Sequence, residues 1–272
     1  SEAARLDLVL GDDYHKLGAA RAGLLNDASG VDALVRAVPK ALRGDPGLAH
    51  ARFSWRASKG QTDGAIEIIR QFSTSAMALG KPQEWASRRR SLAREMMRNG
   101  KSKLAYEIAS RHFLTDGDDY ADLEWLAGFI ALSDMNDPET ALTHFENFRV
   151  AVASPVSLGR AGYWEGRTYE ALGRPVDAQA AYEFGGEFQT GFYGQLAAEK
   201  AGLAMDPALT GRETYDDFRT LPHAKSSVFQ AALLFHDAGF PLLFTRFTRH
   251  LAEILDAAER GSLAQLALDL DE

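Results

Sequence analysis

The segment from Tyr120 to Leu132, YADLEWLAGFIAL, is apolar at nearly every position after Asp122, and only Glu124 interrupts it. A helix at a protein surface has one apolar stripe and one polar face, so a helix that is apolar all round must be covered on several sides. The chain has 272 residues and a formal net charge of -8. In such an acidic chain, this segment needs neighbouring elements that enclose it.

The sequence around this segment is helical in pattern. Runs of about 10 to 15 residues rich in Ala, Leu, Glu and Arg alternate with Gly, Pro and Asp, and alternating strand patterns are scarce. Ala141, Phe145 and Phe148 fall on one stripe of such a run. Asp137 before it suits an N-cap, and Pro138 suits the first helical position, where its missing N–H costs nothing.

The helical runs recur with a regular period. Small residues begin successive second helices at intervals of 40, 36 and 37 residues: Ala65, Ala105, Ala141 and Ala178. In the first helices, Gly128 and Gly166 are 38 residues apart. A period of this length is typical of tetratricopeptide-like helix hairpins, in which a first helix lies between its partner and the flanking repeats. We therefore predict an all-α superhelical solenoid of antiparallel helix hairpins, forming one domain over residues 1–272.

The boundaries of further hairpins are also visible. Gly60 and Gly100 are predicted at the ends of first helices, and two or three short helices are predicted before residue 45. A loop with a short helix is expected after Gly202, followed by further helices. Because the chain stops at DLDE without a polar capping helix, we expect the natural protein to continue.

Composition excludes several classes of function. The net charge of -8 argues against the basic surface that nucleic-acid binding requires. No run of about 18 apolar residues is present, so no membrane span is predicted, and SEAARLDLVL at the N-terminus lacks the pattern of an export signal. The chain contains 0 cysteines, which rules out disulfides and thiolate metal sites.

Three segments resemble the superhelical domain of soluble lytic murein transglycosylases, periplasmic enzymes that cleave peptidoglycan. They are DYADLEWLAGFIAL (119–132), SPVSLGRAGYWEGRTYEALG (154–173) and FQTGFYGQLAAEKAG (188–202). The resemblance covers roughly Val31 to Asp271. It implies a curved support that guides glycan strands, a lysozyme-like catalytic domain downstream, periplasmic localisation, and peptidoglycan and that catalytic domain as partners.

The resemblance places the chemistry outside this chain. In this family one catalytic glutamate, usually followed by serine, acts as acid and then as base in forming a 1,6-anhydro sugar, and this chain contains no Glu-Ser pair. We therefore expect no catalytic residue and no cofactor here. The seven histidines are scattered without a metal-binding spacing, so no metal site is predicted either.

Other charged groups suggest sites only superficially. Glutamates near aromatic residues could form an acid pair, but solvated helix faces explain them better: Glu165, Glu170, Glu183 and Glu187. The acidic run at 116–119 lacks the other ligands of a calcium loop and is expected at a helix N-terminus. The arginines of one helix could meet an anionic partner, although a solvated face is favoured: Arg88, Arg89, Arg90, Arg94 and Arg98.

A few residues remain as candidates for substrate contact. They are Tyr193 and Gln195, in the segment with the most specific resemblance, and Arg90 and Arg94 on the basic helix. Tyr193 and Gln195 could equally fix a turn by bonding to backbone carbonyls. Trp164 could stack on a sugar, but its stripe with Ala161 favours core packing.

Two functions are compatible with these observations. The resemblance favours a scaffold and substrate-guiding domain of a lytic transglycosylase. The repeat pattern alone would equally allow a free-standing helical-repeat adaptor that binds a protein or peptide partner.

Overall fold

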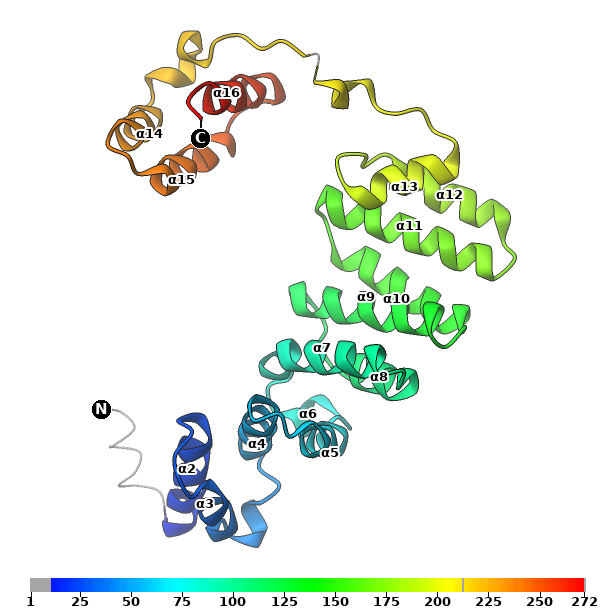
Figure 1. Cartoon of the computed structure of the whole chain (residues 1–272), viewed down its shortest axis with the longest axis vertical. Helices are drawn as coiled ribbons and strands as arrows, with labels where there is room; N and C mark the ends of the chain where they lie inside the picture. The colour runs from blue at the N-terminus through cyan, green and yellow to red at the C-terminus, as the bar shows by residue number, and fades with distance from the viewer. Residues whose placement is uncertain (1–10, 212, 272) are drawn as a thin grey trace. The chain divides into compact units, whose positions relative to one another are not determined.

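The computed structural model describes residues 11–211 and 213–271, and these residues form helices and turns without any strand (Figure 1). The fold is all-α, as the sequence predicts. The segment 1–10, in which the sequence shows no export signal, and Glu272 lie outside the described residues. Among the described helices, none has both the length and the apolarity needed to cross a membrane.

Contacts within the chain form two compact units, Ser1–Met205 and Asp206–Glu272. The sequence predicts one superhelical domain over residues 1–272, whereas the packing separates the last three helices from the rest. The boundary lies in the segment after Gly202, which the sequence identifies as a loop with a short helix. The structure places the short helix η2 (Pro207–Thr210) in that segment.

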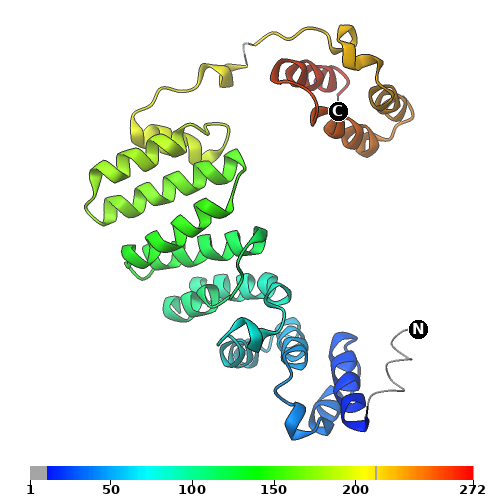
Figure 2. The same cartoon turned by 180° about the vertical axis from the view of Figure 1, so that it is seen from behind.

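The first unit is a tetratricopeptide-like stack of helix hairpins in chain order, which both views show (Figures 1 and 2). Each hairpin joins a first helix to a partner that packs against it. The pairs are α4 (Pro46–Ser58) with α5 (Thr62–Phe72), α7 (Pro82–Arg98) with α8 (Ser102–Ser110), α9 (Gly117–Ser133) with α10 (Pro138–Ala151), and α11 (Pro155–Ala171) with α12 (Pro175–Gly186).

Shorter elements complete this unit. They are α2 (Asp12–Leu25), α3 (Val31–Ala37), the 3-10 helix η1 (Lys40–Leu42), α6 (Ala76–Leu79) and α13 (Phe192–Ala201), which packs on α11 and α12. The N-terminal short helices agree with the sequence prediction.

The predicted helix boundaries are confirmed. Asp137 caps α10, with its side chain accepting a hydrogen bond of 3.2 Å from the Thr140 backbone N–H. Gly60 and Gly100 follow the ends of α4 and α7 with φ of 70° and 69°. This left-handed conformation is easily adopted only by glycine, so these residues end the first helices and allow the chain to reverse.

Small residues hold the hairpins together at close distance. Ala65, Ala105, Ala141 and Ala178, which defined the period, are all buried. A Cβ at Gly128 would lie 2.9 Å from the ring of Phe145 in α10, and a Cβ at Gly162 would lie 2.5 Å from the Gly185 backbone in α12. In these two pairs, α9 with α10 and α11 with α12, the helices therefore approach so closely that a larger side chain has no room.

The helix α9 is enclosed as its apolar sequence requires. It packs against α7, α8 and α10, and Leu123, Leu126 and Ile130 are fully buried. Trp125, which the continuous apolar pattern would also bury, is only partly buried. Its ring lies beside Phe129, which is also partly buried, away from the fully buried positions of α9.

The second unit has its own small core. Its helices are α14 (Ser227–Asp237), α15 (Pro241–Ala252) and α16 (Ala257–Asp269), preceded by the 3-10 helices η3 (Phe218–Thr220) and η4 (Pro222–Lys225). Phe218, Phe229, Leu251 and Leu263 pack together in its centre.

The contact between Gly162 and Gly185 predicts a large effect of one methyl group. Gly162→Ala should lower the free energy of unfolding by about 1 to 3 kcal/mol, because the new Cβ collides with backbone atoms. Gly18→Ala in α2 is the matched control, since nothing lies within 4 Å of its Cβ position. That control should instead gain about 0.5 to 1 kcal/mol of helix propensity. Urea denaturation of both variants checks this, and equal changes would contradict the close contact.

Candidate functional site: an aromatic face on the first helices

A chain of aromatic rings runs across the first helices of neighbouring hairpins and α13. We name this group the ring surface, and it consists of Trp125 and Phe129 in α9, Trp164 in α11, and Phe192 and Tyr193 in α13. The centroid of the Trp164 ring lies 5.1 Å from Phe129, 6.2 Å from Trp125 and 6.1 Å from Tyr193. Trp164 is therefore the centre of the surface.

The helical period places these rings side by side. Trp125 and Phe129 are one turn apart on α9, and their rings stack at 5.4 Å. Phe192 opens α13, and its ring meets that of Tyr193 edge to face at 5.2 Å. The rings of α9, α11 and α13 thus form one continuous surface.

The ring surface is neither core nor fully exposed. Trp125, Phe129, Trp164 and Tyr193 are partly buried, and Phe192 is 68% exposed. Trp164 stacks on the buried Phe145 at 5.9 Å, so the predicted core packing holds for one of its faces. The indole N–H groups of Trp125 and Trp164 have no hydrogen-bond partner, which is an unmet polar requirement within an apolar surface.

One arginine that the sequence did not single out lies against this surface. The guanidinium carbon of Arg160 in α11 is 4.8 Å from the centroid of Trp125 and 4.9 Å from that of Phe148. Attraction between a cation and the ring faces stabilises this position. Burial lowers the pKa of Arg160, and Asp122, Tyr193 and Arg94 lie within electrostatic range of it.

Two of the four predicted contact residues, Tyr193 and Arg94, lie within electrostatic range of Arg160. Tyr193 belongs to the ring surface, and Arg94 is a residue of α7. Arg90 is held in an ion pair with Asp119 at 3.2 Å and in a second one with Asp122. Arg90 therefore links α7 to α9, and its charge is largely neutralised within the chain.

Gln195, the fourth predicted contact residue, is not part of the ring surface. Its side-chain amide donates a hydrogen bond of 3.0 Å to the backbone carbonyl of Gln189. This contact corresponds to the second of the two roles that the sequence left open, the fixing of the turn before α13.

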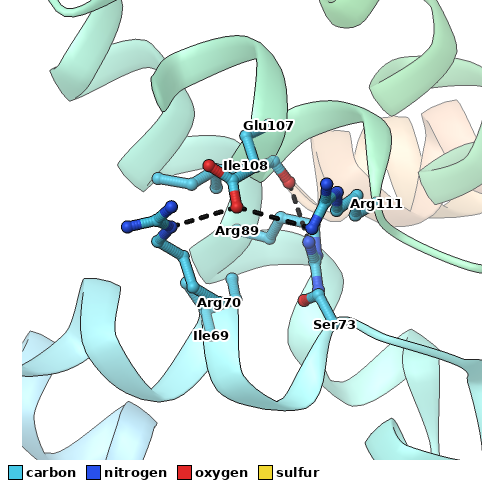
Figure 3. Close-up of a pocket in the computed structure, with 7 residues that line it drawn as sticks. All are labelled: Ile69, Arg70, Ser73, Arg89, Glu107, Ile108 and Arg111. Atoms are coloured by element: carbon cyan, nitrogen blue, oxygen red, sulfur yellow. Dashed lines mark hydrogen bonds and ion pairs between the residues drawn. The ribbon is translucent and has the colours of Figure 1, made fainter. Parts of the chain in front are cut away.

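The prediction of a solvated face is wrong for Arg89, which is 0% exposed. Figure 3 shows its side chain between α5 and α8 in a pocket where Glu107 pairs with Arg70 and Arg111. Arg89 donates to the backbone carbonyl of Ile108 at 2.8 Å and to the Ser73 hydroxyl at 2.6 Å. The space between these side chains is too small for a ligand.

Helix termini explain how an arginine without a carboxylate partner can be buried. Ile108 lies in the last turn of α8, and Ser73 directly follows α5. The carbonyl groups at a helix C-terminus carry partial negative charge, which stabilises a cation there. Burial lowers the pKa of Arg89 to about 9. Arg89 thus joins two successive hairpins from inside the stack.

Glu124, the polar residue within the apolar segment, performs the same task in the next hairpin. It is 5% exposed, and its carboxylate accepts hydrogen bonds from His112 Nε2 at 2.9 Å, His144 Nδ1 at 2.7 Å and Asn147 Nδ2 at 3.2 Å. His112 follows α8, and the other two donors belong to α10. The carboxylate therefore ties α9 to both flanking second helices.

The hydrogen-bond directions in this network are self-consistent. The Leu114 backbone N–H donates to His112 Nδ1 at 3.0 Å, so the proton of His112 is on Nε2 and faces Glu124. His144 donates through Nδ1, and its Nε2 is 3.1 Å from the Tyr106 hydroxyl, which can donate to it. Burial alone would raise the pKa of Glu124, but these hydrogen bonds lower it to about 2.

The glutamates near aromatic residues have separate surroundings. Glu165 is 2% exposed and pairs through Oε2 with Arg149 at 2.8 Å, while Oε1 has no partner and burial raises its pKa. Glu170 pairs with Lys200, and Glu183 and Glu187 are exposed. The described residues include no group of three or more His, Asp or Glu arranged to hold a metal ion.

The pKa of Glu124 predicts how stability depends on pH. A carboxylate whose pKa is about 2 when folded and about 4.5 when unfolded stabilises the fold fully above pH 4.5 and loses this contribution as the pH falls toward 2. The contribution is on the order of 3 kcal/mol. In Glu124→Gln, the free energy of unfolding should therefore fall less between pH 5 and 3 than in the parent.

The control for this measurement is Glu199→Gln, which changes an exposed carboxyl group in α13. Its pH profile should match that of the unchanged chain in urea denaturation. If Glu124→Gln also matches it, the buried carboxylate does not link the hairpins as described.

Comparisons with known proteins were made by sequence and by structure. No family model matches the chain, and no curated protein matches it. Among solved structures, a crystal structure of MamA protein is similar to it at 18% sequence identity and a TM-score of 0.40, covering 72% of this chain and 98% of that chain.

Proposed function

We propose that this chain is the non-catalytic helical region of a periplasmic lytic transglycosylase, and that its ring surface guides glycan strands of peptidoglycan. One observation carries the proposal. The three segments that resemble this family form α9, α11 and α13, and the rings of those three helices make up the ring surface. The residues behind the resemblance and the residues of the candidate site are therefore largely the same.

The chemistry of the surface suits a sugar polymer. Aromatic faces pack on the C–H faces of sugar rings, and the Tyr193 hydroxyl can exchange hydrogen bonds with sugar hydroxyl groups. Partly buried rings on three successive helices offer several places of contact along a strand. Such a surface favours binding along an extended ligand over enclosure of a small one.

The chemistry of cleavage belongs, in this proposal, to the rest of the parent enzyme. No Glu-Ser pair is present in the sequence, and the buried Glu165 is committed to Arg149. The chain would then support and orient the strand while a lysozyme-like domain cuts it. An adaptor that binds a peptide is the competing function, and the same experiment separates the two.

The test measures binding of the purified chain to peptidoglycan sacculi by co-sedimentation. Phe192→Ser and Tyr193→Ala should each weaken binding about threefold to tenfold, because each removes one ring contact worth about 0.5 to 1.5 kcal/mol. Val150→Ser is the matched control, since Val150 is 89% exposed but lies on the second helix α10. Its binding should equal that of the parent.

Other outcomes would overturn the proposal. Sacculi that fail to bind the chain, or equal binding by the ring variants and the parent, would remove the glycan-guiding role and favour a peptide adaptor. Soluble 1,6-anhydromuropeptides released by the chain alone, and absent from a heat-treated control, would show that it is itself catalytic.

A further inference from the structure

Arg160 differs from the other buried charged groups of the first unit. Among the described residues its side chain makes no hydrogen bond and no ion pair, whereas Arg89, which also has a buried Nε–H without a partner, donates two hydrogen bonds through its other nitrogens. The side chain is only partly buried, and Nε is the one guanidinium nitrogen that is fully buried without a partner. A partly desolvated cation of this kind is stable only when something compensates its charge.

The compensation within the chain is incomplete. Glu124 accepts from three side-chain donors, Glu165 pairs with Arg149, and Arg89 caps helix termini. Arg160 has only two ring faces, and contact with a ring face contributes about 0.5 to 2 kcal/mol. Its cation is therefore the least compensated of these four charges.

The charges nearby increase the need for an anion. Arg94 lies within electrostatic range of Arg160 and disfavours its charge, and Arg94 has no ion-pair partner among the described residues. Asp122 lies within electrostatic range but is hydrogen-bonded to Arg90. Two arginines within electrostatic range of each other thus lack a direct acidic partner among the described residues, in a chain whose net charge is -8.

We propose that Arg160 and Arg94 form a subsite for a carboxylate carried by the ligand that the ring surface holds. A guanidinium binds a carboxylate through two parallel N–H···O hydrogen bonds, which an ammonium cannot reproduce. The rings next to Arg160 would pack on the sugar that bears the acid. This inference rests on the proposed function, and it adds that the site selects carboxylate-bearing glycan over neutral glycan.

Two sources can supply the carboxylate in peptidoglycan, namely the stem peptides and the lactyl ether of the muramic acid residues. Three soluble probes separate them: glycan strands with intact stems, strands freed of stems by an amidase and so left with lactyl carboxylates, and a chitin hexasaccharide without carboxylates. Binding of each probe is measured by isothermal titration calorimetry at two salt concentrations.

The parent chain should bind at least one acidic probe about tenfold to a hundredfold more tightly than the chitin hexasaccharide, as expected for hydrogen bonds to a charged group. Arg160→Gln and Arg94→Gln should reduce this preference, because they lower the affinity for the acidic probes by a larger factor than the affinity for the hexasaccharide. Arg160→Lys should keep only part of the preference for the acidic probe. Lysine keeps the positive charge but lacks the two parallel N–H donors of a guanidinium. Arg98→Gln, an exposed arginine on the same helix α7, should keep the full preference.

The outcomes distinguish this inference from the proposed function. Equal binding of all three probes by the parent, or an unchanged preference in Arg160→Gln, overturns the carboxylate subsite while glycan binding stands. No binding of any probe overturns both. Circular dichroism melts of the variants identify any that fail to fold, and for those the salt dependence of the parent decides, since a carboxylate–arginine contact weakens with salt.

Discussion

The stack depends on one position in each first helix that is surrounded by protein on every side. This position is occupied by Arg89 in α7, Glu124 in α9 and Gly162 in α11, each one turn before a small buried residue. Arg89 and Glu124 bond both to the helix pair before them and to their own partner helix, whereas Gly162 brings the two backbones into direct contact. A charge at such a position needs hydrogen-bond partners from the neighbouring helices, and an uncharged residue there must be small.

This constraint determines where a ligand could bind. Because protein atoms cover the buried side of each first helix, only residues on its other side can contact a ligand. In α9 and α11 these residues are aromatic, and Arg160 lies among them. The same register that fixes Glu124 inside the stack therefore directs Trp125, the next residue, toward the ring surface.

The sequence predicted the hairpins, their period and their caps because these follow from local patterns such as the spacing of Ala141 and Ala178. It did not predict that His112 and His144, 32 residues apart, meet at Glu124. Nor did it distinguish the buried Arg89 from the exposed Arg88, since both follow the same polar run. Contacts between hairpins determine both features. The only local sign of such contacts in the sequence was Glu124, a single acidic residue within an apolar helix.

The most direct test of the ring surface as the ligand site is the intrinsic fluorescence of the chain, which has four tryptophans. Trp125 and Trp164 lie at the surface, whereas Trp85 is fully buried in the core elsewhere and Trp55 lies in α4. Titration with soluble glycan strands should change the emission saturably, and Trp125→Phe with Trp164→Phe should abolish the change while keeping the rings. An unaltered change in that double variant would show that the ligand binds at another part of the chain.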